Sequence, residues 1–556
     1  MPSSRLLVRS AFATALAAIV LSVAVSAGQQ SGPRFRPDDP LMIDDDRAID
    51  VGTLQEWEDG DIYDFLRGSF LGAGSKDDIP ALNVNTLGEV PDSSWFTDRY
   101  RDGLPAADVL ARGPDTLAAL DITGWPVSEG KGSGASPGFR VRGPDGEDYQ
   151  LKFDPPSNPE MSTAAEVIGA SFYHAFGYNT VEMYLVEFDG ANFTLLPDAK
   201  MEQGGKERPL ARGDVEEVLK LSARSANGKY RATARRYPKG NVIGNFRYHG
   251  TRPDDPNDIF PHEHRRELRA GRVFAAWLNH DDSRGINSKD IVVGERGRKY
   301  VKHFMYDFNS ILGSGNQKPQ RYRSGNEYRV DGGEALKTLL TLGLYVRPWA
   351  KIDYPDAPPA VGRFESEFFE PASWKPEYPI PAFDRMRPED AFWAARIIAR
   401  FDEPAVRAIV SKGRYSDPAA VDYLVRTLMA RRAKILRAWL TGVTPIVDPA
   451  LGPAGLTFGD AAVDAGVTPA PEGYDVTWYA FDNATGSSRQ VGGRVRVLPG
   501  RPAPMPSALA SGPYVMAAVS RGALPADPAR LYFRLQSGHW QAVGIERPHR
   551  ALTATE

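Results

Sequence analysis

The chain contains no cysteine. This absence excludes disulfide bonds, thiolate nucleophiles and cysteine-ligated metals, and it excludes a lipid anchor attached to a cysteine behind a leader. Histidine is also scarce, with eight residues in 556. The histidines of His262-Glu263-His264 lie two positions apart, so on a helix they would face different directions and would not bind one ion together. We therefore do not expect a zinc site.

An excess of either charge is missing as well. The chain has 67 Lys and Arg against 71 Asp and Glu, a net charge of −4. So small a charge does not favour nucleic acid or a membrane surface as a partner. Hydrophobic residues make up 42% and charged residues 25%, as is usual for globular proteins. The length allows several domains.

Long apolar runs are absent except near the first residue. Arg5 and Arg9 precede the apolar stretch 11–25, which is short for a membrane span, and small residues follow up to Ala27. We predict a signal peptide over residues 1–27, cleaved after Ala27, and no membrane span in the mature chain; an uncleaved anchor is the alternative. An exported chain without disulfides is typical of the bacterial periplasm or the extracellular medium.

Composition and periodicity divide the remaining chain, and together the parts predict an α+β protein. Residues 28–120 are rich in Asp, Gly and Pro and are interpreted as an irregular extension. Residues 121–250 favour strands and residues 251–440 favour helices. Residues 441–472 are rich in Pro, Gly and Ala and are interpreted as a linker. Short strand patterns over 473–556 predict a small β-sandwich-like domain.

A glycine-rich loop from Gly130 to Gly138 begins the strand region. The return strand 149–153 alternates apolar and polar residues, so Lys152 is expected on the face opposite its apolar neighbours. Thr163 to Glu166 matches a capping box at the start of a helix, which offers a purely structural reason for Glu166. Strands at 181–188 and 193–196 are expected to form a hairpin across Asp189-Gly190.

The helical region carries the most informative motif. An amphipathic helix over 263–278 leads into the segment 280–287, in which Asp282 precedes Asn287 by five positions. A short hairpin follows, and then Asp307 and Phe308. Phosphoryl transfer uses one carboxylate to orient the attacking hydroxyl, and an Asn and a second Asp to hold Mg²⁺ on the phosphates. Each residue alone also fits a solvated helix end or a turn.

The motifs follow one another in a fixed order: a glycine loop, a strand lysine, a helix glutamate, an acid with an asparagine, a hairpin and Asp-Phe. This order resembles the protein-kinase-like fold over residues of about 120–440. The resemblance is to the atypical branch, which includes HipA-type, lipid and secretory-pathway kinases. It implies a bilobal domain with an N-lobe over 121–250 and a C-lobe over 251–440. The chain departs from the kinase pattern at Asp281, where an Arg is usual, and at Asn309, where a Gly is usual.

The resemblance implies a role for each matching residue. Asp282 would orient the acceptor hydroxyl and take its proton, and Arg284 would neutralise charge on the transferred phosphoryl group. Asn287 and Asp307 would coordinate Mg²⁺.

On the strand side, Lys152 would contact the α- and β-phosphates of ATP, and Glu166 would hold Lys152 in place. Gly130, Gly132 and Gly134 would let backbone N–H groups approach the phosphates. The function implied is an exported phosphotransferase that uses ATP and Mg²⁺ to modify a hydroxyl on a protein, peptide or glycan.

Three alternatives stay open at this point. The same charges around a triphosphate would serve the transfer of AMP from ATP. ATP is scarce outside the cytoplasm, so the domain is alternatively an inactive kinase-like scaffold or binding module in the cell envelope. Last, the function could reside in the β domain as a carbohydrate-binding surface. The sequence contains no His-Glu-x-x-His motif of a zinc-dependent hydrolase.

Overall fold

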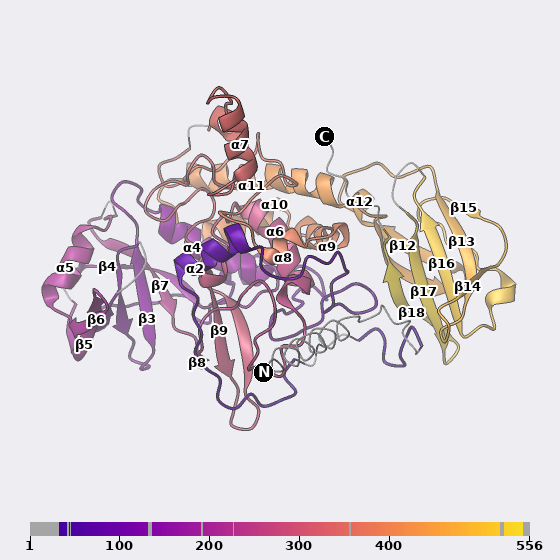
Figure 1. Ribbon diagram of the computed structural model, residues 1–556, viewed down its shortest axis with the longest axis horizontal. Helices are drawn as coiled ribbons and strands as arrows, with labels where there is room; N and C mark the ends of the chain where they lie inside the picture. Colours follow the sequence, from indigo (N-terminus) through magenta and orange to yellow (C-terminus); the bar gives the residue numbers. More distant parts are fainter. Residues whose placement is uncertain are drawn as a thin grey trace, which may run out of the picture.

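The computed structural model describes residues 33–41, 44, 46–131, 136–190, 193–225, 227–354, 357–522 and 527–548. The predicted signal peptide, Gly132 and Gly134 lie outside these ranges. The described chain mixes helices with several sheets, which confirms the α+β class. A seven-stranded sheet lies at one end, helices fill the middle, and a second sheet lies at the other end (Figure 1).

The first sheet has the strand order β4-β7-β3-β2-β1-β5-β6. Its strands are β1 (Val127–Gly130), β2 (Gly138–Arg142), β3 (Asp148–Phe153), β4 (Met183–Phe188), β5 (Leu195–Gln203), β6 (Lys206–Pro209) and β7 (Tyr230–Arg236). Tyr149, Leu151 and Phe153 of β3 enter the hydrophobic core of the sheet. Lys152 lies on the other face and lines a cleft, as the alternation predicted.

Helix α4 (Met161–Ala175) packs against β3, β4 and β7. The predicted capping box at its start is wrong. The Asp154 carboxylate caps the helix instead, because its Oδ1 accepts hydrogen bonds from the backbone N–H groups of Ser162 at 2.8 Å and Thr163 at 2.9 Å. Glu166 therefore lies inside the helix, and its carboxylate is available for other partners.

The predicted hairpin across Asp189-Gly190 is also wrong. β4 pairs antiparallel with β7, which follows it by more than forty residues, whereas β5 pairs parallel with β1. The apolar alternation of β4 is satisfied in this pairing, since Tyr184, Val186 and Phe188 enter the core of the sheet. The local turn signal was therefore overridden by pairing between distant strands.

The central part is helical. Its main helices are α6 (Arg266–Leu278), α9 (Pro388–Ala399), α10 (Glu403–Ser411) and α11 (Pro418–Trp439). The first of these confirms the helix predicted over 263–278 from Arg266 onward. The shorter elements are α2 (Asp61–Leu66), η1 (Arg67–Leu71), α3 (Ala107–Arg112), α5 (Arg212–Lys220), η3 (His262–His264), η4 (Gly285–Asn287), α7 (Gly332–Leu340), η5 (Pro348–Lys351) and α8 (Pro381–Asp384). In the described part of the chain, no helix has the length and apolar character needed to cross a membrane.

A three-stranded sheet of β8 (Asn241–Val242), β9 (Ser288–Val293) and β10 (Tyr300–Met305) connects the two motif segments. The β9–β10 hairpin is the one predicted between Asn287 and Asp307. α6 delivers the chain to the first motif, and its Phe274 and Trp277 are fully buried against α4 residues such as Phe172 and Phe176. The hairpin and the two helices thereby fix both motif segments relative to β3.

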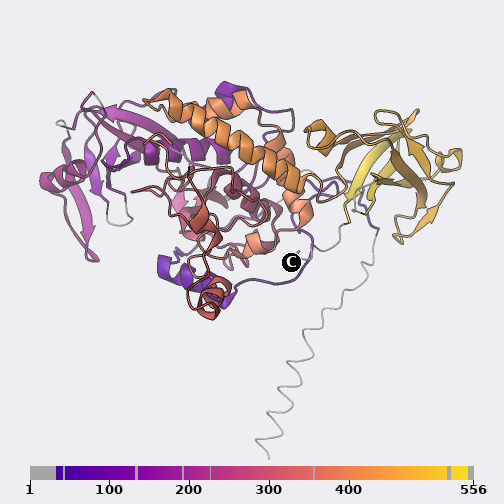
Figure 2. The same cartoon turned by 90° about the horizontal axis from the view of Figure 1, so that it is seen from above.

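The linker predicted over 441–472 is a structured part of the last domain. It contains β11 (Ile446–Gly452), β12 (Gly455–Asp460) and α12 (Ala461–Asp464), because Ile446 and Leu456 are fully buried in the core that also holds Trp478. The main sheet has the order β14-β13-β16-β17-β18, with β15 also paired to β13. These strands are β13 (Tyr474–Phe481), β14 (Ser488–Gln490), β15 (Val495–Val497), β16 (Tyr514–Ser520), β17 (Ala529–Gln536) and β18 (His539–Glu546), with the short turn η6 (Ser507–Leu509) between β15 and β16. Figure 2 shows this domain at the end opposite the seven-stranded sheet.

Candidate functional site

A cleft of about 540 Å³ runs beside the polar face of the seven-stranded sheet. Strands β1, β2, β3, β5 and β7 line one part of it, and β8, η4, β9 and the segment after β10 line another, together with Glu58. Four of the residues expected in a site line it, namely Gly130, Lys152, Asn287 and Asp307. Residues far apart in the sequence therefore come together here.

Lys152 lies at the centre of the cleft wall. Its Nζ is 2.8 Å from Glu166 Oε1 on α4 and 2.9 Å from Asp307 Oδ2 after β10. Lys152 is 5% exposed and Glu166 1%. Burial of a charge is unfavourable unless the charge is paired, so both carboxylates stabilise the ammonium in this position. The structural alternative for Glu166, a capping acid, does not apply.

Glu166 has two further partners, both on β7. Thr233 Oγ1 donates a hydrogen bond to Glu166 Oε2 at 2.9 Å, and Arg235 Nη1 lies 3.7 Å from Glu166 Oε1. Arg235 also donates to the carbonyl oxygen of Tyr306 at 3.1 Å and stacks its guanidinium over the Tyr306 ring at 4.0 Å. Two cations and two carboxylates thus form a compact charge-balanced group.

The charges of this group act strongly on one another. Burial alone would raise the pKa of Asp307, but Lys152 and Arg235 outweigh it and hold that pKa well below its usual range. Asp307 is therefore a carboxylate at any physiological pH. Burial, together with the charge of Lys152, lowers the pKa of Lys131 in the same cleft to about 8. Three cations of the cleft, Lys131, Lys152 and Arg235, therefore lie close enough to influence one another.

The position of Asp307 is fixed by its neighbour. Phe308 is fully buried, with its ring 5.0 Å from that of Tyr173 on α4. Gly169 of α4 makes this approach possible, because a Cβ there would lie 2.5 Å from the Cβ of Phe308. α4 consequently sets the positions of Glu166 and Asp307 together.

The loop before β9 holds the other acid. Asp282 forms an ion pair with Arg284, whose Nη1 is also 3.7 Å from Glu377. Asn287 Nδ2 donates to the Asp282 carbonyl oxygen at 2.8 Å, and the Asn287 carbonyl oxygen accepts the backbone N–H groups of Tyr306 and Asp307. The two motif segments are therefore joined directly by hydrogen bonds.

The two adjacent acids of this loop have different environments. Asp281 Oδ1 accepts hydrogen bonds from Ser310 Oγ at 3.0 Å and Gln320 Nε2 at 2.8 Å, so its side chain is used structurally. Burial raises the pKa of Asp282 to about 7, against the opposing charge of Arg284. A carboxyl group with a pKa near neutrality is suited to accept a proton.

Gly130 and Arg284, both expected to act on the phosphates, have other roles in the structure. A Cβ on Gly130 would lie 2.7 Å from the Met201 Cβ, so this glycine is needed for packing against β5. Arg284 does not line the cleft and is engaged by the carboxylates of Asp282 and Glu377. Gly132 and Gly134 lie outside the described residues.

Sequence reasoning missed Arg235 and Lys131. A signal for Arg235 exists: in β7 the apolar Ala232 and Ala234 alternate with polar residues, which places Arg235 on the face that carries Lys152. Lys131 stands inside the glycine-rich loop, and its Nζ donates to the Ser136 carbonyl oxygen at 2.6 Å. A basic residue within such a loop was the signal for it.

Metal ligands of the usual clustered kind are not found. Within the described ranges, no group of three or more His, Asp or Glu side chains is placed to hold a metal ion. His262 pairs with Asp258, at 2.8 Å, and His264 contacts Arg269. The oxygen ligands that line the cleft include the Asn287 amide oxygen and the Asp307 carboxylate.

Comparison with protein-family models, with curated proteins and with solved structures gives no match to this chain. The function is therefore inferred from the cleft. The cleft holds a buried lysine between two carboxylates, and an amide and a carboxylate share its opening. Asp282, whose pKa burial raises to about 7, is not among the residues that line it.

Proposed function

We propose that the chain is an exported, atypical kinase-like phosphotransferase that uses ATP and Mg²⁺ to modify a hydroxyl on a protein, peptide or glycan. The bilobal kinase-like unit is residues 121–440, and the signal peptide ends at Ala27. The observation that carries the proposal is Lys152, held between Glu166 and Asp307 in a cleft that Asn287 also lines. Phosphoryl transfer needs positioning and charge neutralisation, which this set supplies.

The cleft suits a nucleotide in size and charge. Its volume of about 540 Å³ is within the range of small-molecule sites. Lys131, Lys152 and Arg235 would face the phosphates, which are recognised by cations. The apolar face of the sheet is filled by its own core, so the ligand enters from the polar face.

The amide oxygen of Asn287 and the carboxylate of Asp307 also suit Mg²⁺. This ion prefers oxygen ligands and is usually held by one or two protein groups together with substrate phosphates, so no three-acid cluster is required. Asp307 is ionised, and Asn287 donates through its Nδ2, which leaves its amide oxygen for a metal. When bound, Mg²⁺ would neutralise charge on the phosphates.

Asp282 is the base in this proposal. It takes the proton of the acceptor hydroxyl as the acceptor oxygen bonds to the γ-phosphorus, and the bond from that phosphorus to the bridging oxygen breaks to release ADP. Arg284 orients the Asp282 carboxylate through their ion pair, in place of the expected role on the phosphoryl group. Kinases usually carry an Arg at the position of Asp281, and a phosphorylated loop can dock on that Arg. Because the Asp281 carboxylate instead accepts hydrogen bonds from Ser310 and Gln320, such regulation is not part of the proposal.

The test uses purified protein, Mg²⁺ and ATP labelled on either the γ- or the α-phosphate. Release or transfer of the γ-label that is lost in Asp282→Asn and in Asp307→Asn supports the proposal, and Asp464→Asn in the last domain is the matched control. Transfer of the α-label would identify AMP transfer. Absence of turnover in every case would refute catalysis and favour the scaffold. Export is tested by sequencing the secreted protein, which is expected to begin at Gly28.

A further inference from the structure

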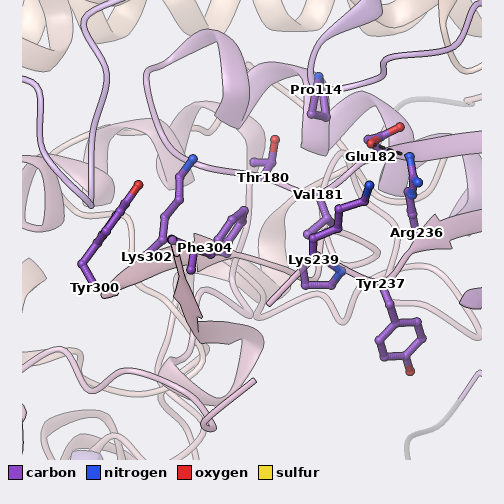
Figure 3. A pocket seen from close by; sticks show the side chains of 13 residues that line it. Pro114, Thr180, Val181, Glu182, Arg236, Tyr237, Lys239, Tyr300, Lys302 and Phe304 are labelled. Atoms are coloured by element: carbon purple, nitrogen blue, oxygen red, sulfur yellow. Dashed lines mark hydrogen bonds and ion pairs between the residues drawn. The ribbon is translucent and has the colours of Figure 1, made fainter. Parts of the chain in front are cut away.

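A second pocket of about 410 Å³ lies on another side of the seven-stranded sheet. Three segments meet there: Thr180 to Glu182 between α4 and β4, Arg236 to Lys239 after β7, and Tyr300 to Phe304 in β10. Figure 3 shows the side chains of Lys302, Lys239 and Arg236 from these segments around it. The pocket thus joins the seven-stranded sheet to the three-stranded sheet.

Lys302 is the unusual group in this pocket. No carboxylate in the described part of the chain forms an ion pair with it, and its ammonium lies 5.5 Å from the ring of Phe304. Its side chain is half-buried. Burial lowers the pKa of Lys302, and the neighbouring cations Arg99 and Arg47 lower it further. A half-buried cation among cations is unfavourable until an anion joins it.

The other charged groups do not supply that anion. Glu182 is engaged by Arg236 at 3.2 Å and by the hydroxyls of Thr116 and Tyr184. Lys239 is 75% exposed at the rim, 3.9 Å from Glu147. Of the charged side chains lining the pocket, three are cations and one is the carboxylate of Glu182. Arg236 is also 3.2 Å from Asp145, outside the lining, so Lys302 is the cation of this lining for which the described residues supply no carboxylate partner.

The rest of the lining is apolar and partly aromatic. Val181 is 4% exposed, and the rings of Tyr300 and Phe304 lie beside Lys302 on the same strand face. Alternate residues of β10 point to one side, which places these three side chains in a row. A ligand that satisfies this lining has a flat apolar body and an anionic group that reaches Lys302.

We propose that this pocket binds an organic phosphate monoester with a flat apolar body, whose phosphate meets Lys302 and whose body lies against Phe304. Charge-assisted hydrogen bonds from ammonium groups to phosphate are among the strong ones in proteins.

The pocket is connected to the nucleotide cleft by one residue. Tyr237 belongs to the lining of both. Its ring points away from the other labelled side chains of the pocket (Figure 3) and lies 4.5 Å from the Arg140 guanidinium, which lines the cleft. A ligand that orders the segment 236–239 would therefore act on the wall of the cleft, although binding itself requires no catalysis.

The probe for the test is phenyl phosphate, with phenol as its neutral counterpart. Binding to the full chain is followed by calorimetric titration and by the shift in thermal unfolding. We expect phenyl phosphate to bind the wild type and Lys152→Met alike, and Lys302→Gln at least about tenfold more weakly, a loss of about 1.4 kcal/mol. Lys337→Gln, which alters a lysine outside the pocket, is the matched control and is expected to bind as the wild type does. Phenol is expected not to bind.

Several results would overturn the proposal. Loss of binding in Lys152→Met with retention in Lys302→Gln would place the phosphate in the main cleft. Equal binding by all variants, or no saturation below about 10 mM, would show that the pocket has no specific affinity. The folding of Lys302→Gln is checked by its thermal unfolding without ligand. We expect the same unfolding temperature as the wild type or a higher one, and this result would exclude misfolding as the cause of lost binding. Benzoate as tight as phenyl phosphate would contradict the proposal of a phosphate monoester.

Discussion

The ion pair between Lys152 and Glu166 predicts a large energetic coupling between these side chains. Their charged atoms are 2.8 Å apart, and both residues are nearly inaccessible to water. Removing one member of a buried pair costs about 3–5 kcal/mol, because the other charge stays buried without its partner. Asp307 and Arg235 retain part of the balance, so we expect about 3 kcal/mol for Lys152→Met and for Glu166→Gln alone.

The coupling is measured by a double-mutant cycle. The combined variant removes both charges. Its loss of unfolding free energy should be smaller than the sum of the two single losses by about 1–3 kcal/mol. Urea unfolding followed by both fluorescence and circular dichroism gives these values where the two signals coincide. Additive losses in Lys152→Met and Glu166→Gln would refute the reasoning, since they would mean that the two side chains do not interact.

A matched control exists on the same sheet. Lys200 Nζ on β5 lies 2.6 Å from Glu207 Oε1 on β6, a contact as short as that of the buried pair. Their side chains are 52% and 66% exposed, so water and salt screen the interaction. The cycle with Lys200→Met and Glu207→Gln should show additive effects. Coupling as large as in the buried pair would mean that burial is not the cause.

Three further predictions concern the same site. If Asp282 is the base, the transfer rate should rise with pH up to about 7 and then level off, because only the deprotonated carboxylate accepts a proton, and a pH–rate profile measures this. Gly169→Ala should cost about 1–3 kcal/mol by pushing Phe308 away, whereas Gly213→Ala, where no atom lies within 4 Å, should be nearly neutral in the same urea titration. Asp154→Ala should cost about 0.5–2 kcal/mol through loss of the α4 cap, and an unchanged melting temperature would contradict that assignment.

Local patterns in the sequence were sufficient for part of the site. Period-two alternation placed Lys152 on the polar face of β3, and the short hairpin between Asn287 and Asp307 explains why these two residues meet. Both are consequences of a few neighbouring residues. The helical character of residues 251–440 was predictable for the same reason, from apolar periodicity.

The rest depends on contacts between distant segments. Arg235 reaches the site only because β7 pairs with β3, and Asp154 caps α4 from outside the helix. The segment 441–472 looked like a linker by composition, yet burial of Ile446 and Leu456 in the last domain orders it. Composition and local turn signals carry no information on such pairings.

The most direct test of the central claim is calorimetric titration of the protein with ATP, with and without Mg²⁺. We expect saturable binding that requires Mg²⁺ and is lost in Asp307→Asn, because that change removes the carboxylate proposed to hold the ion. Lys302→Gln, outside the cleft, is expected to retain binding. No binding at millimolar ATP, or equal binding by Asp307→Asn, would contradict the assignment of this cleft as a nucleotide site.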